Sequence, residues 1–293
     1  MKESIIIETA GVLSDNGFRS EGSRHAAEYI RNSKYLDVLE KQNISLHWNE
    51  DVINSSSKIN SLDVLKDLSL KISNFTYREV KKHNQFLIIG GDHSTAVGTW
   101  AGVKKALKST SFALVWMDAH MDAHTLLSSP TGNLHGMPVS ILTNNGEDAL
   151  QNTYPSDHFV KGEDLYFFGS RDFEVEEEDL LCRMGSNVFK MNARENKSAA
   201  VNVFKEMMEE INGKYDYFGI TLDMDLFDPF HVPGVNSPSP NGMLPEDILE
   251  ILSKIKIKNK LIGFEICEFN PFKDTEHKTE KLLIECIRTV FSS

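Results

Sequence analysis

Short apolar runs alternate along this chain with longer amphipathic segments, and this alternation restricts the fold more than any other feature of the sequence. Several of the runs, such as FALVWM at 112–117, are apolar at almost every position. Strands of this kind are buried on both faces, as happens when crossover helices cover a parallel sheet. The pattern therefore predicts an α/β fold with a mainly parallel sheet between helices.

The individual elements can be assigned from the same pattern. We expect eight strands, at 4–9, 44–48, 85–91, 112–118, 164–170, 187–191, 217–225 and 261–268. We expect helices at 22–41, 61–82, 94–108, 137–144, 175–184, 195–212, 245–256 and 275–291. No linker divides the chain, so we expect a single domain over residues 1–293. Two long loops, at 119–134 and 226–243, are candidates for a functional role, because long loops in compact domains are usually functional.

The composition argues against several classes of protein. With 31 Lys and Arg against 43 Asp and Glu, the formal net charge is −12, whereas a nucleic-acid-binding protein would need a basic surface. No run approaches the ~18 apolar residues of a membrane span, and the three isoleucines near the N-terminus are too few for a secretory signal. Three cysteines without a CxxC motif fit a reducing compartment. We therefore expect a cytoplasmic protein with no nucleic-acid or membrane partner.

Carboxylates and imidazoles gather at the carboxyl ends of four predicted strands. In parallel α/β sheets, ligands bind beyond these ends. One strand is followed by the sequence DAHMDAH, in which polar residues stand at every second position. Alternate side chains of an extended chain point the same way, so these residues can converge on one point. The four clusters are Asp92-His93, the run from Asp118 to His124, Asp223 with Asp225, and Glu268.

So many ionisable groups aimed at one buried place would repel one another or remain unsatisfied without a counter-charge. A divalent cation supplies that charge, and mixed carboxylate and imidazole ligands suit Mn, Fe, Co or Zn. Six ligands are many for one ion, whereas bridging carboxylates would use them over two ions about 3.5 Å apart. The six candidate ligands are His93, Asp118, His120, Asp122, Asp223 and Asp225.

Each motif taken alone has a simpler interpretation. GDHS is more often a strand-to-helix turn with a capping residue, and a DxD pair is usually solvated. The acidic run EVEEEDLL, from Glu174 to Leu181, is expected to be mostly a solvated helix face, with its first residue as the exception. The occurrence of several motifs at successive strand ends favours the metal site over these separate interpretations.

Together the motifs GGDHS, DAHxD, GNLHG, DMDxxDP and EFNP resemble the signatures of the ureohydrolases, the arginase and agmatinase family. Their order and spacing also match, and the similarity runs from about Gly22 onward. The sequence GNLHGMP, at 132–138, resembles the arginase branch. The resemblance implies an open, mainly parallel eight-stranded sheet between helix layers in a three-layer αβα arrangement, and subunits that form a homo-oligomer, commonly a trimer or hexamer.

The resemblance also implies two Mn²⁺ ions per chain, although other divalent ions such as Co²⁺ could take their place. Asp118 and Asp223 would bridge the ions. His135, in GNLHG, matches the proton-shuttle histidine of the family, and Glu268, in EFNP, matches the carboxylate that pairs with the substrate guanidinium. The remaining ligands would be His93 and Asp122 for one ion, and His120 and Asp225 for the other.

The implied reaction agrees with elementary chemistry. Guanidinium is resonance-stabilised and resists attack by water, but two cations can lower the pKa of a bridging water so that hydroxide exists at neutral pH. A carboxylate can hold the planar guanidinium. The leaving amine needs a proton, which histidine can carry near pH 7. We therefore expect a binuclear amidinohydrolase in which metal-bridging hydroxide attacks the guanidinium carbon and converts L-arginine to L-ornithine and urea.

The residues expected at the substrate rim depart in part from the arginase pattern. Thr131 and Asn133 keep plausible positions for reading the α-carboxylate. His124 stands where arginases usually have Asn, Glu174 where they usually have Asp, and Ser237 where Thr is usual. All five are predicted to bind substrate. The departures leave a sister activity open, namely agmatinase, guanidinobutyrase or formiminoglutamase.

The same motifs can be compared with two further classes of protein. A metal-dependent deacetylase has a related fold and an Asp-His-Asp metal set, but His93 and the pair Asp223 and Asp225 favour two ions and thus argue against a deacetylase. A non-catalytic descendant of the fold would usually have lost ligands, whereas all six are present here.

Overall fold

The computed structural model describes residues 4–18, 21–49, 53–54, 61–146, 158–190 and 197–292. Eight strands form one sheet in the order β2-β1-β4-β9-β8-β5-β6-β7, and the two-residue strand β3 pairs with β1. Every pairing is parallel, as the buried apolar runs predict. The strands are β1 (Ile5–Leu13), β2 (Ile44–Trp48), β3 (Ile53–Asn54), β4 (Phe86–Ile89), β5 (Phe112–Met117), β6 (Leu165–Phe168), β7 (Asn187–Phe189), β8 (Tyr217–Asp223) and β9 (Leu261–Cys267).

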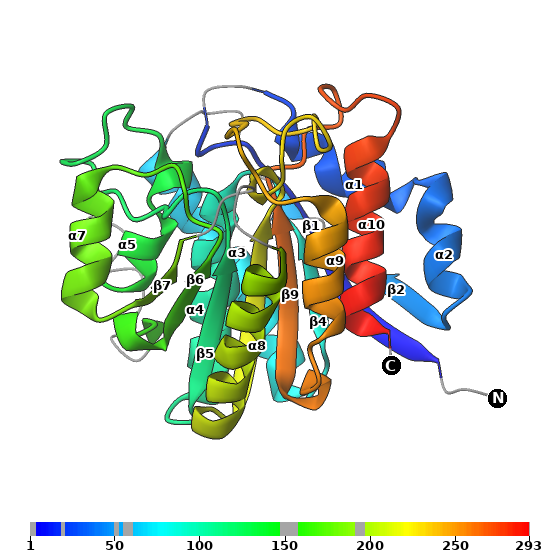
Figure 1. Cartoon of the computed structure of the whole chain (residues 1–293), viewed down its shortest axis with the longest axis horizontal. Coiled ribbons are helices and arrows are strands. Elements are labelled where there is room, and N and C mark those ends of the chain that lie inside the picture. The colour runs from blue at the N-terminus through cyan, green and yellow to red at the C-terminus, as the bar shows by residue number, and fades with distance from the viewer. Residues whose placement is uncertain are drawn as a thin grey trace.

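Helices cover both faces of this sheet and complete three layers (Figure 1). One layer holds α1 (Ala26–Arg31), α2 (Asp37–Glu40), α8 (Lys197–Lys214), α9 (Pro245–Ser253) and α10 (Lys278–Phe291). The other holds α3 (Leu62–Lys81), α4 (Ala96–Leu107), α5 (Pro138–Leu142) and α7 (Val175–Met184). The predicted αβα fold is therefore confirmed. Among the described residues, no helix is both long enough and apolar enough to span a bilayer.

One predicted helix, at 22–41, is broken in the structure. The chain forms α1, then a 3₁₀ turn at Lys34–Leu36, then α2. The break lies at Ser33, whose backbone is extended and whose hydroxyl accepts a hydrogen bond from the backbone N–H of Tyr35. A serine in this role satisfies an N–H group that has no partner within the turn, so it starts a new element where the amphipathic pattern alone suggests continuation.

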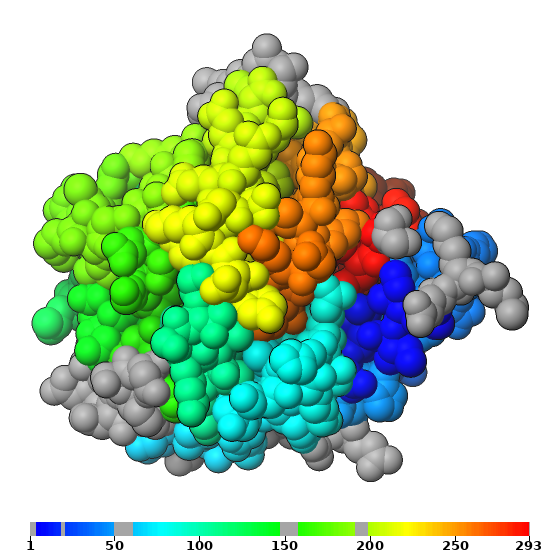
Figure 2. Space-filling view, turned by 90° about the horizontal axis from the view of Figure 1, so that it is seen from below, coloured from blue at the N-terminus to red at the C-terminus, as the bar shows by residue number. Residues whose placement is uncertain are grey.

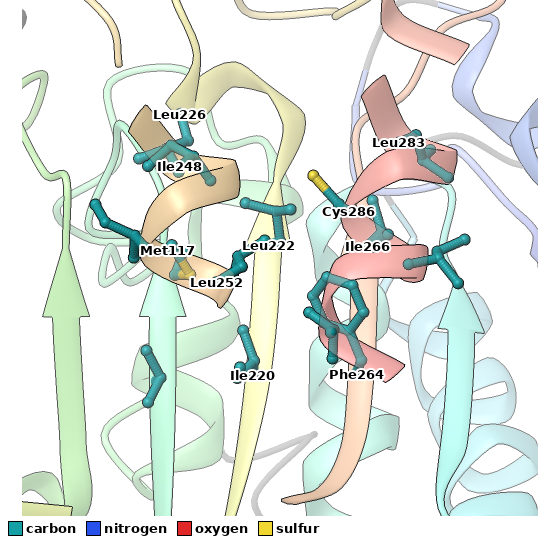
Figure 3. Close-up of a cluster of buried hydrophobic side chains, with 14 of the residues drawn as sticks. Met117, Ile220, Leu222, Leu226, Ile248, Leu252, Phe264, Ile266, Leu283 and Cys286 are labelled. Atoms are coloured by element: carbon teal, nitrogen blue, oxygen red, sulfur yellow. The ribbon is translucent and has the colours of Figure 1, made fainter. Parts of the chain in front are cut away.

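The core lies between the sheet and its helices. Figure 3 shows α9 and α10 packed on the central strands β8 and β9, with their apolar side chains pointing toward the sheet. Full burial of an aliphatic or aromatic side chain stabilises the fold by about 1.5–3 kcal/mol, so this contact holds the central strands in place. The buried residues labelled there include Ile220, Leu222, Ile248, Leu252, Phe264, Ile266, Leu283 and Cys286.

The two edges of the sheet carry different structures. The loops that follow β5, β8 and β9 lie above the carboxyl ends of the strands in Figure 1. The opposite edge, seen from below in Figure 2, carries the connections that lead into β4, β5, β8 and β9 (cyan, teal, yellow and orange). The sheet therefore places all four predicted polar clusters at the same edge.

Candidate metal centre and substrate cavity

The turn after β4 positions the first candidate ligand. His93 begins a 3₁₀ turn at His93–Thr95, and the carboxylate of Asp92 caps that turn by accepting a hydrogen bond from the Ser94 N–H at 2.9 Å. Gly91 precedes the cap, and a Cβ at this position would lie 1.6 Å from the carbonyl oxygen of Ser14. Only glycine allows this close approach between the end of β4 and the loop after β1. The GGDHS motif is thus explained by packing as well as by its histidine.

Three carboxylates surround one nitrogen of His93. Its Nδ1 lies 3.0 Å from Asp118 Oδ2, 3.0 Å from Asp122 Oδ2 and 3.2 Å from Asp223 Oδ2. None of the three has the direction of a hydrogen bond, so within the described part of the chain this buried nitrogen has no hydrogen-bond partner. A buried polar atom rarely remains unsatisfied, and a cation among these four atoms would satisfy it.

The other nitrogen of His93 explains this orientation. Its Nε2 lies 2.9 Å from the Thr221 hydroxyl, which donates a hydrogen bond to the buried carboxyl group of Glu265 at 3.0 Å. The Thr221 oxygen can therefore accept the Nε2–H, which leaves the lone pair of Nδ1 facing the carboxylates. The indole ring of Trp116 stacks on the imidazole with ring centroids 4.4 Å apart and restricts its rotation.

A second group of ligands shares Asp118 with the first. His120 Nδ1 lies 3.5 Å from Asp118 Oδ1 and 3.3 Å from Asp225 Oδ2. The second oxygen of the Asp225 carboxylate is buried without a hydrogen-bond partner among the described residues. In each group, His93 with Asp118 and Asp223, and Asp118 with His120 and Asp225, the ligand atoms lie within 4.8 Å of one another. Two adjacent groups joined by one carboxylate suit two cations better than one.

The carboxylates of this centre resist ionising together. Burial raises the pKa of Asp122 to about 6, with Asp118 adding to the shift. Burial, then Asp225 and Asp118, raises the pKa of Asp223 well above its usual value. Burial alone would also raise the pKa of Asp118, but the neighbouring imidazoles of His120 and His93 lower it instead. Divalent cations would relieve the repulsion, so the donor set and its electrostatics both fit the expected ions.

His135 and Glu268 form a contact beside the centre. His135 Nδ1 lies 3.1 Å from Glu268 Oε1, which also accepts the backbone N–H of His93 at 2.9 Å. Burial alone would lower the pKa of His135, but the Glu268 carboxylate raises it above its usual value. The edge of the Phe18 ring packs on the imidazole, with centroids 4.5 Å apart. The two residues predicted to be catalytic are thus in direct contact.

The predicted substrate-binding residues meet at one cavity of about 140 Å³. His120, Asp122 and His135 also line it, so the cavity connects the metal centre with the loop after β5. The amide oxygen of Asn133 is buried there without a hydrogen-bond partner among the described residues. Glu268 does not line the cavity and is almost fully buried. The predicted residues along the wall are His124, Thr131, Asn133, Glu174 and Ser237.

One acidic residue of this wall departs from the sequence prediction. The acidic run predicts a solvated helix face at Glu177, but this residue is 3% exposed and lines the cavity. Its carboxylate accepts hydrogen bonds from the backbone N–H groups of Ala123 and Glu174. Glu174 and Glu177 form a capping box at the start of α7. The E-x-x-E spacing before a helix is the signal in the sequence for this inward position.

His124 completes the wall. Its Nε2 lies 2.9 Å from Glu174 Oε2 and 3.4 Å from Glu177 Oε2. Its Nδ1 lies 3.1 Å from the Ser128 hydroxyl. The histidine therefore contacts the carboxylates of the wall and lies outside the two ligand groups that share Asp118.

Comparison with known proteins agrees with this geometry. A sequence model of the arginase family matches residues 7–292. The arginase of Entamoeba histolytica is 29% identical over 287 residues, covering 94% of each chain. The crystal structure of that organism's arginase with L-ornithine superposes with a TM-score of 0.84 at 27% identity, covering 99% and 100% of the two chains. The arginase of Bacillus subtilis gives 0.87 at 24% identity, with 99% of both chains covered.

The buried position of Glu177 predicts a pH-dependent stability. Burial is the main cause that raises its pKa, to about 8 from 4.5. Between these two pH values, Glu177 keeps its proton in the folded state but loses it in the unfolded state. Its contribution to the free energy of unfolding is therefore fully present below pH 4.5 and is lost as the pH rises toward 8. In the metal-free protein, Glu177→Gln should raise the free energy of unfolding relative to wild type by roughly 1–3 kcal/mol more at pH 8 than at pH 5.

Urea denaturation at the two pH values measures this difference. Glu176→Gln is the matched control, because Glu176 is exposed on the same helix and should show no such dependence. Parallel stability changes at both pH values in the Glu177 variant would contradict the prediction.

Proposed function

The chain belongs to the arginase family and is a hydrolase of amidino C–N bonds, and we propose that its substrate is L-arginine, which it converts to L-ornithine and urea. The observation that supports this proposal most strongly is the pair of ligand groups joined through Asp118, directly beside the cavity. We further propose that two Mn²⁺ ions bind there and that the enzyme is a cytoplasmic homo-oligomer.

The ligand contacts support a division of the six residues between two ions. His93 and Asp122 would hold one ion, and His120 and Asp225 the other. Asp118, which belongs to both ligand groups, and Asp223, which contacts His93, would be the shared ligands that the family resemblance implies. Imidazole and carboxylate donors suit Mn²⁺ and also Co²⁺. When bound, two such ions lower the pKa of water enough to provide hydroxide at neutral pH.

The chain's own residues would bind the guanidinium and move the proton. By the family resemblance, Glu268 would pair with the guanidinium, and in the structure His135 lies against this carboxylate. The substrate would take the place of the imidazole against Glu268, which frees His135 at the wall of the cavity. Before substrate binds, the Glu268 carboxylate favours the charged form of His135. Once released to the cavity wall, the protonated histidine would give its proton to the leaving amine.

The cavity wall would distinguish one guanidino compound from another. The side chains of Thr131 and Asn133, on the loop after β5, can donate hydrogen bonds to an α-carboxylate. Burial alone would raise the pKa of Glu174, but His124 holds it below its usual value, so Glu174 offers a carboxylate that suits an α-ammonium group. A bound cation would favour the ionised form of Glu177 beside it. These opposite ends match the zwitterionic end of L-arginine, whereas agmatine lacks the carboxylate.

One contact of His124 supports a second candidate substrate for this member of the family. His124 lies against both Glu174 and Glu177, the carboxylates that would bind the α-ammonium group. If this contact persists with substrate bound, the wall would favour a guanidino acid without an α-amino group, such as 4-guanidinobutyrate. Agmatinase and formiminoglutamase activities are further outcomes of the same substrate assay, and a deacetylase is a more distant candidate.

The purified enzyme should contain close to two tightly bound divalent ions per chain. Asp118→Ala should disturb both ions, because Asp118 belongs to both ligand groups, whereas His93→Ala should mainly weaken one. Elemental analysis after gel filtration measures both effects. One tightly bound zinc with full activity would contradict the binuclear proposal.

His135→Asn should lower kcat by about 10²–10⁴, the range for general acid–base groups, with little change in metal content. Asn keeps a polar side chain but cannot carry the proton. Urea release measured across pH 7–9.5 tests this role. An unchanged rate would exclude a proton-transfer role, and loss of metal would identify His135 as a ligand instead.

L-arginine should be preferred over agmatine by at least about 10² in kcat/KM, because a site that binds the carboxylate leaves its own polar groups unpaired with agmatine. Asn133→Ala should reduce this preference by raising the KM for L-arginine. A substrate panel including 4-guanidinobutyrate and formiminoglutamate provides the measurement. A higher kcat/KM for any of these than for L-arginine would replace the arginase proposal with a sister activity.

A further inference from the structure

The cavity wall holds a cluster of donors that the proposed binuclear centre does not use. His124, Glu174 and Glu177 bring one imidazole nitrogen and two carboxylate oxygens within 4.8 Å of one another. We propose that this cluster, which we call the rim site, binds a third divalent cation, of the borderline class that accepts nitrogen and oxygen donors. This inference rests on the proposed function only for its effect on substrate, because the ion itself can be detected without catalysis.

The spacing of the donors supports a shared ion. His124 Nε2 lies 2.9 Å from one carboxylate oxygen and 3.4 Å from the other. Ligands at ~2.0–2.1 Å from one ion, at the corners of a tetrahedron, lie roughly 3.3 Å apart. The two groups of the binuclear centre show histidine-to-carboxylate distances from 3.0 to 3.5 Å. The rim site thus repeats the donor types and the spacing of the centre beside it.

The environment of the imidazole suits a metal ligand. His124 is almost fully buried, and its Nδ1 lies 3.1 Å from the Ser128 hydroxyl. That hydroxyl is held by the backbone N–H of Thr125 at 2.9 Å and can accept the Nδ1–H with its second lone pair. Without an ion, Nε2 is hydrogen-bonded to Glu174 Oε2 at 2.9 Å. A bound ion would take the place of that proton while Nδ1 keeps its contact with Ser128, and a polar group that orients the far nitrogen is a regular partner of metal-bound histidines.

The two carboxylates of the rim site differ in their exposure to solvent. Glu177 is buried and its carboxylate is fixed by the backbone N–H groups of Ala123 and Glu174. Glu174 is about half exposed at the mouth of the cavity. A site with one exposed ligand should bind its ion more weakly than the buried centre, so the third ion exchanges while the first two stay bound.

A third ion at the rim site would compete with substrate binding. Glu174 and Glu177 are the carboxylates proposed to bind the substrate ammonium group, so the ion and that group compete for the same oxygens. An excess of the ion should therefore raise the KM for L-arginine without changing kcat. Guanidinobutyrate has no ammonium group, so its KM should not rise.

Equilibrium dialysis of tag-free, metal-free protein against increasing Co²⁺, followed by elemental analysis, tests the rim site directly. We expect bound Co²⁺ to reach two ions per chain and then three. His124→Asn and Glu177→Gln should weaken the third ion by at least about 100-fold and leave the first two, whereas Ser128→Ala should weaken it by about 10–100-fold. Glu176→Gln, on the exposed side of α7, is the matched control and should still bind three.

The outcomes separate this inference from the proposed function. A wild-type plateau at two ions would overturn the rim site, and so would a third ion that persists in both the His124 and Glu177 variants, because that ion would lie elsewhere on the surface. If the enzyme with two ions bound releases urea from L-arginine, the proposed function is supported whether or not a third ion binds. Three ions without hydrolysis of any guanidino compound would support the rim site and refute the proposed function.

Discussion

The central constraint on this structure is the electrostatic repulsion between the carboxylates that the sheet brings together. Four aspartates and two histidines lie at neighbouring strand ends, and buried carboxylates at this spacing cannot all ionise without a compensating charge. The apolar sheet makes this possible, because strands buried on both faces between packed helices hold the ligands rigidly against that repulsion. The stability of the core is therefore what allows a strained, cation-binding edge to persist.

A second set of polar groups supports the first from behind. The buried carboxyl group of Glu265, on β9, receives hydrogen bonds from Thr99, Trp100 and Thr221, and Thr221 in turn orients His93. This network links α4, β8 and β9 beneath the metal centre. The network explains why the unprotonated Nδ1 of His93 points toward three carboxylates. The opposite nitrogen, Nε2, is held by the Thr221 hydroxyl, which Glu265 fixes in turn.

The same principle acts at the cavity wall with a different result. His124 contacts two carboxylates there as well, but Glu174 is exposed and belongs to a helix start. The buried centre and the rim thus contain similar donors under different solvation, so a cation at the rim would exchange more readily than one at the centre. Whether substrate ammonium or a metal ion occupies the rim is a matter of competition for the same oxygens.

The sequence by itself determined the fold class and the edge of the sheet at which the candidate metal ligands lie. Near-continuous apolar runs indicate a sheet buried on both faces, and the period of two after β5 predicts that Asp118, His120 and Asp122 can face one point. Family motifs then added the roles expected for His135 and Glu268. These conclusions needed only local patterns, because the carboxyl ends of parallel strands always meet at one edge.

The tertiary structure alone decided which polar groups contact one another. The E-x-x-E spacing can indicate a capping residue at Glu177, but only the docking of α7 against the loop after β5 brings that carboxylate to the Ala123 N–H. Likewise, the Ser33 hydroxyl starts the 3₁₀ turn between α1 and α2 by accepting the backbone N–H of Tyr35. The contacts of Thr221 with Glu265, and of His124 with Glu174 and Glu177, join residues 44 to 53 positions apart. Pairings over such separations follow from packing in three dimensions, which no local period in the sequence records.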